Sequence, residues 1–243
     1  MSLSPRANAG SMWAMSDGAV LITGGSGGIG GESAKRFARH GYRPIVAYAR
    51  NRQAADAVAD RTGGLSVQLD LSQASSIDAA IENLETTAPD LAGVVLAGSP
   101  PPQLIPFGKI DESDLRLHLD VQVIGTHRLL ASLVRKFFRT KKNGFVVGVL
   151  SAATGLGSGR AKASLGAYVI GKYGRAGVLA LAQQDYPWLR VRTVSSSYTD
   201  TALLPVFDGR YVEQLGQRGE VAPPDEVART IVEAAVGSVA TQR

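Results

Sequence analysis

The segment that most constrains the fold lies near the start of the chain, where an apolar run leads into a cluster of glycines and then into a helix. Residues 18–22 predict a buried strand, residues 23–30 read Thr-Gly-Gly-Ser-Gly-Gly-Ile-Gly, and residues 32–40 have helical spacing. Glycines let a backbone approach a pyrophosphate closely, and a helix N-terminus offers it free N–H groups and a positive dipole end. This order favours a dinucleotide-binding turn over a purely conformational one. The candidate contacts are Thr23, Gly24, Ser26, Gly28, Ile29 and Gly30.

Apolar runs of strand length alternate with helical segments along the rest of the chain. Further buried strands are expected at residues 44–48, 65–69, 91–97, 145–150 and 189–195. Further helices are expected at residues 75–87, from 111 or 113 to about 139, from about 168 to 184, and from Pro223 onward. Six strands alternating with helices predict a single α/β domain, a Rossmann-like doubly wound parallel sheet with helices on both faces. Residues that carry chemistry should then gather at the carboxyl ends of the strands.

Some local features refine this prediction. Ser72 is expected to be the N-cap of the helix at 75–87. Residues 198–221 have no clear periodicity and predict a mobile flap. Residues 1–16 are rich in Ser, Ala and Met without periodicity, so we expect a flexible extension or an expression remnant ahead of one domain at 17–243.

Composition excludes several classes of protein. The chain has 243 residues and no cysteine, which excludes disulfides and thiolate chemistry. Its three histidines form no close pair at metal-ligand spacing, so we expect no metal site. No apolar run approaches the roughly 20 residues of a membrane span, so we expect a soluble, cytoplasmic protein. The net charge of +5 is too scattered to favour nucleic acid, and suits an anionic cofactor or an acidic protein partner.

The end of the second expected strand bears on which dinucleotide binds. An acidic residue at this place would accept the ribose 2′-hydroxyl, whereas an arginine accommodates a 2′-phosphate. Arg50 stands there, which favours NADP(H). The alternative is that Arg50 and Arg52 are ordinary surface charges of a loop.

Tyr168 and Lys172 are four residues apart on an expected helix, so their side chains project from the same face. A fixed cation near a phenol favours the phenolate, which would lower the pKa of Tyr168 toward the range of proton transfer. The alternative is an ordinary solvated or half-buried pair. Ser151 is expected at the carboxyl end of the fifth strand, in the same layer as the glycine turn.

Together, these motifs resemble the short-chain dehydrogenase/reductase family over residues 18 to about 236. The turn from Thr23 to Gly30 is similar to its cofactor turn, Tyr168 and Lys172 to its catalytic pair, and Ser151 to its catalytic serine. The length and the residues before the fifth strand look most like 3-oxoacyl-acyl-carrier-protein reductases, which implies a role in fatty acid metabolism.

The resemblance implies a role for each site residue. Ser151 would orient the carbonyl, Tyr168 would donate the proton, and Lys172 would lower the phenol pKa and bind the nicotinamide ribose. Thr201 would contact the nicotinamide carboxamide. The other implied cofactor contacts are Asp70, Leu71, Ala97 and Gly98.

The chain departs from the family pattern at several positions. Residues 95–98 read Val-Leu-Ala-Gly where Asn-Asn-Ala-Gly is usual, so an amide that braces the strand is missing. Gln122 stands in place of an asparagine whose backbone holds a water of the proton relay. Ser196 and Ser197 replace the usual Pro-Gly, which changes how the flap begins.

Two further departures concern a loop and the end of the chain. The loop between Ser151 and Tyr168 is longer than usual, which makes Thr154 or Ser164 an alternative hydroxyl. Residues 237–240 lack the Gly-rich, Asp-containing last strand, so an interface of a tetramer built on it would be altered.

Three functions remain open from the sequence. The first is an NADP(H)-dependent reductase of a carbonyl, with a 3-oxoacyl thioester as substrate, an acidic acyl carrier protein as a possible partner, and a homo-oligomeric state of dimer or tetramer. The second is an NADP(H)-binding protein of low activity with a regulatory or assembly role, which Gln122 motivates. The third is a reductase of an unrelated small ketone.

Overall fold

Six parallel strands form one sheet in the order β3-β2-β1-β4-β5-β6 in the computed structural model, which describes residues 17–156 and 159–237. The strands are β1 (Ala19–Thr23), β2 (Arg43–Tyr48), β3 (Leu65–Gln68), β4 (Leu91–Leu96), β5 (Phe145–Ser151) and β6 (Arg190–Ser196). The strand order reverses between β1 and β4, and ligands of such sheets bind at this switch point. The expected extension at 1–16 and most of the departing segment at 237–240 lie outside the described residues.

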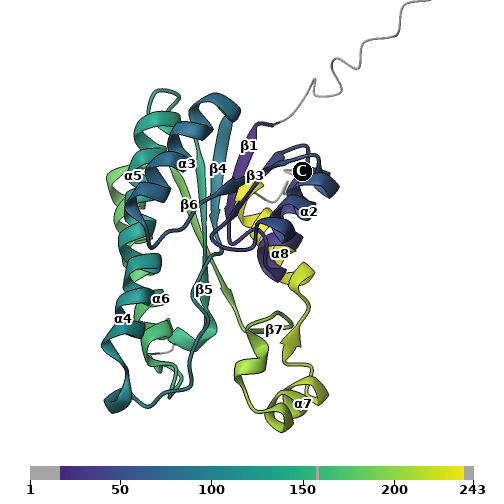
Figure 1. Ribbon diagram of the computed structural model, residues 1–243, viewed down its shortest axis with the longest axis vertical. Coiled ribbons are helices and arrows are strands. Elements are labelled where there is room, and N and C mark those ends of the chain that lie inside the picture. The colour runs from purple at the N-terminus through teal and green to yellow at the C-terminus, as the bar shows by residue number, and fades with distance from the viewer. Residues whose placement is uncertain (1–16, 157–158, 238–243) are drawn as a thin grey trace, which may run out of the picture.

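Helices cover both faces of the sheet (Figure 1). One layer contains α1 (Gly28–Arg39), α2 (Arg52–Thr62) and α8 (Pro224–Val236). The other contains α3 (Ala74–Thr87), α4 (Glu112–Leu119), α5 (Gly125–Leu133) and α6 (Gly166–Asp185). The predicted doubly wound parallel sheet is therefore confirmed. No helix in the described part of the chain is long and apolar enough to cross a membrane.

The two-residue period of the strands divides the core into two layers. On β1, Leu21 packs into the cluster that contains residues of α3, α5 and α6, whereas Val20 and Ile22 pack into the cluster that contains residues of α1, α2 and α8. All three side chains are fully buried. Because both faces of the strands are covered, their sequence is continuously apolar instead of alternating.

The helical region expected to end near residue 139 contains two π-helical segments. Segment η2 (Asp120–Ile124) separates α4 from α5, and η3 (Val134–Phe138) follows α5. At Gly125, a Cβ would clash with the carbonyl oxygen of Leu71, in the turn that follows β3, so only glycine permits this approach. Asp111 caps the region by accepting a hydrogen bond from the Ser113 amide at 2.8 Å.

The expected cap at Ser72 is wrong. Helix α3 begins at Ala74 with Gln73 as its N-cap residue, which makes no side-chain cap. The Ser72 hydroxyl donates to the Asp70 carboxylate at 2.7 Å, because the two residues form a local turn after β3. Helix α2, which the sequence analysis did not predict, is capped by Asn51.

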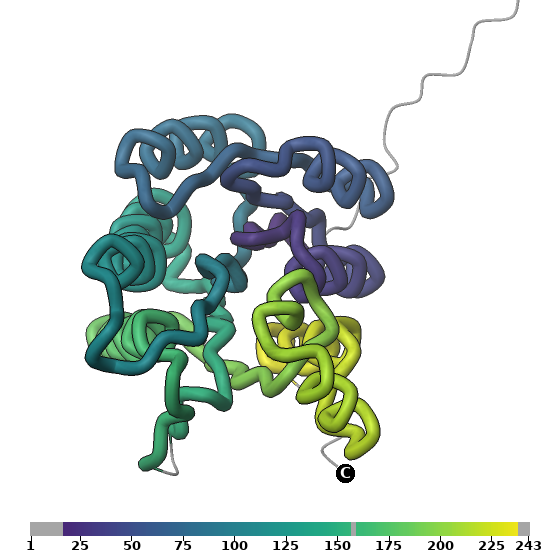
Figure 2. The backbone as a smooth tube through the Cα atoms, turned by 60° about the horizontal axis from the view of Figure 1, so that its bottom comes forward, coloured from purple at the N-terminus to yellow at the C-terminus, as the bar shows by residue number. Residues whose placement is uncertain are grey.

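The segment predicted as a mobile flap has regular structure. It contains β7 (Tyr198–Thr199), η5 (Leu204–Val206), α7 (Gly209–Gln217) and β8 (Val221–Ala222). Strands β7 and β8 pair in parallel, and Asp208 caps α7. Three of these elements, β7, η5 and β8, have only two or three residues each and are too short to show a period in sequence. Helix α7 has nine residues with apolar and polar sides, a pattern that the sequence analysis missed. Figure 2 shows the segment next to α8, across from the chain that leads from β5 to α6.

Candidate functional site

The glycine turn joins β1 to α1 at the carboxyl edge of the sheet. Gly24 has a φ of +64°, and a Cβ there would lie 2.8 Å from the Gly98 Cα atom. A Cβ on Gly30 would clash with the Gly24 carbonyl oxygen. Helix α1 begins at Gly28 with Gly27 as its N-cap, which has no side chain to cover the first amides. The close backbone packing and the uncapped helix start fit a pyrophosphate.

The ends of β1 and β4 are tied together beside this turn. The Thr23 hydroxyl accepts a hydrogen bond from the Gly98 amide at 3.1 Å. Arg175 of α6 donates to the carbonyl oxygens of Leu96 at 3.0 Å and Gly98 at 2.7 Å. Arg175 therefore braces the strand end at which the expected amide is missing. The sequence analysis did not consider this residue.

The other cofactor candidates lie around the same edge. Arg50 is exposed just beyond β2, and no ion pair found within residues 17–156 and 159–237 includes it. The Asp70 carboxylate is occupied by Ser72, and the Leu71 side chain is buried in the core. Ser26 is half-buried in the turn. Thr201 lies against the turn, since a Cβ on Gly28 would be 2.9 Å from its Cγ2 atom.

A cavity of about 320 Å³ lies at this edge of the sheet. Ser151 at the end of β5 and the Tyr168–Lys172 pair of α6 line it together. Its wall also contains the cofactor candidates Ile29, Ala97 and Thr201. Three of the four residues predicted to take part in the chemistry therefore line one cavity, although they come from two elements, and the fourth, Gln122, does not line it.

Burial sets the protonation behaviour of the Tyr168–Lys172 pair. The Lys172 ammonium donates to the Val149 carbonyl oxygen at 2.9 Å and lies 5.4 Å from the centre of the Tyr168 ring. Burial lowers the pKa of Lys172 well below its ordinary value, and the charge of Arg175 lowers it further. Burial also raises the pKa of Tyr168. The hydrogen bond with Ser151 and the charge of Arg175 lower this pKa, but by less than burial raises it.

The expected lowering of the Tyr168 pKa by Lys172 is therefore wrong for this structure. Sequence spacing showed that the two side chains share a face, but it did not show how little water surrounds them. Desolvation disfavours the charged form of each group, so it acts against both the phenolate and the ammonium.

Gln122 lies in η2 and is not among the residues of the cavity wall. Its amide nitrogen is 3.0 Å from Nδ1 of His118, and its Oε1 atom has no partner among the described residues. A Cβ on Gly171 of α6 would be 2.6 Å from that amide nitrogen. The longer amide thus fits because residue 171 is glycine.

The alternative hydroxyls are not in the cavity wall. Thr154 donates to the Ser151 carbonyl oxygen at 2.8 Å, and Ser164 is exposed with a φ of 63°. Neither lines the cavity, whereas Ser151 does. Of the three hydroxyls considered, Ser151 is the one in position to meet a substrate.

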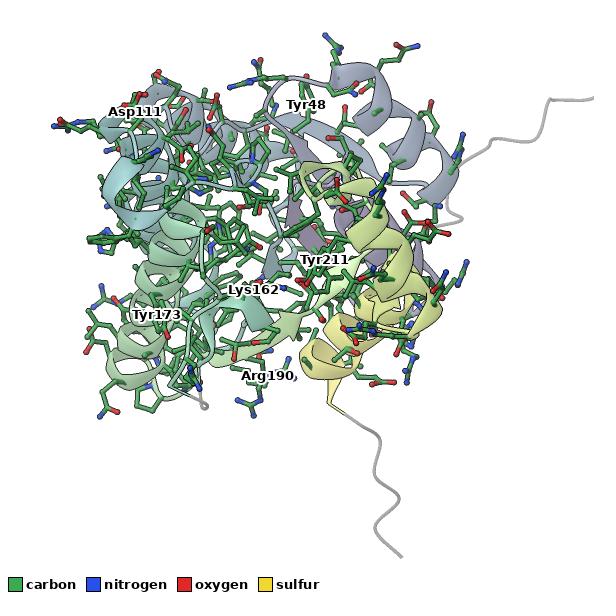
Figure 3. The ribbon with its side chains drawn as sticks, turned by 90° about the horizontal axis from the view of Figure 1, so that it is seen from below. Tyr48, Asp111, Lys162, Tyr173, Arg190 and Tyr211 are labelled. Atoms are coloured by element: carbon green, nitrogen blue, oxygen red, sulfur yellow. The ribbon has the colours of Figure 1, made fainter. Side chains whose placement is uncertain are left out.

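The mouth of the cavity has a cationic and aromatic cluster that sequence analysis missed. Lys162 lies 4.2 Å from the centre of the Tyr198 ring and donates to the Tyr211 hydroxyl at 3.0 Å (Figure 3 labels Lys162 and Tyr211). Phe207 packs edge-on against Tyr198. Arg160 also lines the cavity, and no acidic residue is among its described lining. The loop before α6 and the segment around α7 therefore meet at this cluster.

Known proteins match the chain by family and by fold. A family model described as short chain dehydrogenase matches residues 18–208. A 3-ketoacyl-(acyl-carrier-protein) reductase from Brucella melitensis, complexed with NADH, superposes with a TM-score of 0.79 at 24% identity, over 91% of this chain and 92% of that one. A comparison with curated protein sequences gives no match.

Two further structures show how varied the proteins of this fold are. A ribose-5-phosphate isomerase from Brucella melitensis 16M has a TM-score of 0.81 at 23% identity, over 91% of this chain and 86% of that one. A gluconate 5-dehydrogenase from Burkholderia cenocepacia J2315, in complex with NADP and tartrate, has a TM-score of 0.80 at 18% identity, over 92% of this chain and 89% of that one. These identities support the fold, while the family model covers most of the chain. The protein belongs to the short-chain dehydrogenase/reductase family of oxidoreductases.

Proposed function

We propose that the protein is an NADP(H)-dependent reductase of a carbonyl group, with a 3-oxoacyl thioester as its substrate. The observation that carries the proposal is the meeting of Ser151, Tyr168 and Lys172 in one cavity beside the glycine turn. The turn from Thr23 to Gly30 would hold the pyrophosphate, and Arg50 would meet the 2′-phosphate. The nicotinamide, when bound, supplies the hydride.

The side chains of the cavity perform the remaining chemistry. A carbonyl that receives hydride develops negative charge on its oxygen, so it needs a hydrogen-bond donor and a proton. The Ser151 hydroxyl would orient the carbonyl oxygen, and the Tyr168 phenol would donate the proton. Burial raises the pKa of Tyr168, so the phenol holds its proton at neutral pH until the oxygen becomes basic.

The thioester part of the proposal rests on the mouth of the cavity. Arg160 and Lys162 lie there with the apolar side chains of Leu165, Leu203 and Phe207. This lining suits an acyl chain whose carrier has negative charge, such as an acidic acyl carrier protein in the cytoplasm. Two exposed apolar side chains, Ile124 of η2 and Leu181 of α6, further support the proposal of a homo-oligomer.

The test is the oxidation of NADPH, followed by its absorbance, with a panel of 3-oxoacyl thioesters and unrelated ketones. Tyr168→Phe should reduce turnover by about 100-fold or more and leave NADPH binding nearly unchanged, because it removes only the proton donor. Tyr173→Phe is the matched control, since this phenol is on the same helix but outside the cavity wall. Undiminished turnover in Tyr168→Phe would show that the proton comes from elsewhere.

A second candidate is an NADP(H)-binding protein of low turnover. It is favoured by the contacts of Gln122, whose amide pairs with His118, and of Lys172, which donates to the Val149 carbonyl oxygen. Tight NADPH binding without turnover of any thioester or ketone would favour this candidate. Turnover of ketones but not of thioesters would keep the reductase and reject the acyl substrate.

A further inference from the structure

Arg175 of α6 is a fully buried charged side chain that does not line the cavity. Its two terminal nitrogens donate to backbone carbonyls at the end of β4, and its Nε atom has no hydrogen-bond partner among the described residues. None of the ion pairs in residues 17–156 and 159–237 gives it a carboxylate. A buried charge without a counter-ion is strongly unfavourable, so a neutral side chain would brace these carbonyls with a smaller desolvation penalty.

The position of Arg175 on α6 relates it to the proton donor. It follows Lys172 by three residues and Tyr168 by seven, spacings that place all three on one face of the helix. Tyr168 and Lys172 line the cavity, whereas Arg175 does not. The guanidinium is therefore held behind the cavity wall, out of reach of a substrate but close enough for its charge to act on the wall.

Burial affects the two cations of this helix differently. It lowers the pKa of Lys172 well below its ordinary value, so desolvation acts against the charge of this ammonium. Burial lowers the pKa of Arg175 as well, but a guanidinium starts from so high a value that it keeps its charge throughout the titration of a phenol. A guanidinium is also less strongly hydrated than an ammonium, so it suits an interior position better.

We propose that Arg175 is a positioning residue that acts through Tyr168: its guanidinium, fixed by the carbonyls of Leu96 and Gly98, is the permanent positive charge that favours the phenolate. The attraction between Arg175 and Tyr168 opposes the burial of the phenol. Among the described residues, three other cations lie near the phenol: Lys172 on its own helix, and Arg160 and Lys162, which line the same cavity. The ring of His118 meets the Tyr168 ring edge-on at 5.9 Å, and its Nε2 atom lies 3.8 Å from the Asp114 carboxylate. A role of Arg175 in catalysis rests on the proposed function, whereas the effect of its charge on the ionisation of Tyr168 does not.

The experiment is a spectrophotometric pH titration that measures phenolate formation in the cofactor-free protein. The signal of Tyr168 is obtained by subtracting the titration of Tyr168→Phe. Arg175→Met and Arg175→Gln both remove the charge, and each should raise the Tyr168 midpoint by on the order of one pH unit. Arg43→Met is the matched control, because Arg43 donates to a backbone carbonyl at the opposite edge of the sheet.

Several outcomes decide the proposal. A Tyr168 midpoint that rises in the Arg175 variants and stays unchanged in Arg43→Met supports it. An unchanged midpoint in Arg175→Gln overturns the proposal. If Arg175→Met does not fold, Arg175→Gln decides alone, because the glutamine amide can still donate to a carbonyl oxygen. In the active enzyme, the acid limb of the pH profile of alcohol oxidation should move upward in parallel. If the wild type shows no turnover, the proposed function fails, while the titration still decides on Arg175.

Discussion

Single side chains around Tyr168 determine what the site can do chemically. Ser151 and Arg175 both act against the effect of burial on the pKa of the phenol, one by a hydrogen bond and the other by its charge. Arg50, by contrast, is exposed at the far end of the cofactor region. The proposed chemistry and the proposed choice of cofactor thus depend on different residues, and each can be tested separately.

Arg50 should determine the preference for NADPH. We expect wild-type protein to bind NADPH more tightly than NADH, and Arg50→Ala to reduce that preference by about 10-fold, because a charge-assisted contact with the 2′-phosphate is lost. Arg61→Ala, which removes an exposed arginine at the end of α2, is the control. Dissociation constants from fluorescence titration measure both. Equal affinities of the wild type for the two cofactors would contradict the assignment.

His118 should make the protein sensitive to acid. Burial lowers its pKa below the ordinary 6.5, with Lys172 acting in the same direction and Asp114 against it. At a pH between the pKa of His118 in the folded protein and its pKa in the unfolded chain, the unfolded chain binds more protons than the folded protein. The folded state is therefore favoured fully above about pH 6.5, the pKa of a histidine in an unfolded chain. This part of its stability is lost as the pH falls toward the pKa in the folded protein. His118→Leu should therefore show a smaller drop in melting temperature between pH 7 and pH 5 than wild type.

The control for this measurement is His127→Gln. Its side chain is exposed, so it is solvated in both the folded and the unfolded chain. It should keep the wild-type dependence of the melting temperature on pH. An unchanged dependence in His118→Leu would show that other groups cause the acid sensitivity.

At the scale of elements, the contact between η2 and α6 adapts the helices to each other. The buried Gln122 amide lies over Gly171, and a Cβ on Gly174 would likewise clash with the Val123 side chain. Glycines on α6 therefore allow the π-helical segment to approach. The backbone of a helix would otherwise favour alanine at such positions.

Gly171→Ala should destabilise the protein by about 1–3 kcal/mol, because the new methyl group meets both the Gln122 amide and the His118 carbonyl oxygen. Gly177→Ala on the same helix has open space and should stabilise by about 0.5–1 kcal/mol. Urea unfolding measures both. Combining Gly171→Ala with Gln122→Asn should recover part of the loss, and strictly additive effects would contradict the proposed contact.

At the scale of the whole molecule, apolar side chains remain exposed on the outer face of the α6 layer. Ile124 of η2 is 61% exposed, and Leu181 and Tyr173 of α6 are 59% and 39% exposed. Figure 3 shows Tyr173 on the outside of the molecule. We propose that these side chains belong to a surface that binds a second copy of the chain, because a contiguous exposed apolar patch marks a protein-binding surface.

The oligomeric state can be tested on this surface. Light scattering should give a mass of two or four times the 25.4 kDa chain, and Ile124→Glu with Leu181→Glu should shift it toward one chain, because two charges would be buried without partners. Phe107→Glu is the control, since Phe107 is 84% exposed on η1 (Phe107–Lys109), a different element. A monomeric wild type would contradict the expected homo-oligomer.

Local patterns in the sequence were sufficient to predict the sheet and the main candidates of the site. Continuous apolar runs indicated the buried strands, and the glycine turn and Ser151 were placed by their positions at strand ends. The same approach failed for residues 198–221, where β7, η5 and β8 are too short to show a period and the amphipathic pattern of α7 was missed. It also failed for Ser72, whose hydroxyl prefers a local turn. The π-helical segments were also not predictable, because η2 packs against α6 and η3 against β4, and these contacts join residues that are far apart in the sequence.

By itself, the sequence determined the doubly wound fold, the glycine turn and the shared helix face of Tyr168 and Lys172, because each depends on residues that are close in the chain. Only the tertiary structure decided the surroundings of that pair. Arg175 reaches the end of β4, and Gln122 fits over Gly171, across long separations in sequence. The direction of the pKa shifts of Tyr168 and Lys172 was decided in the same way, since desolvation depends on everything that packs around a group.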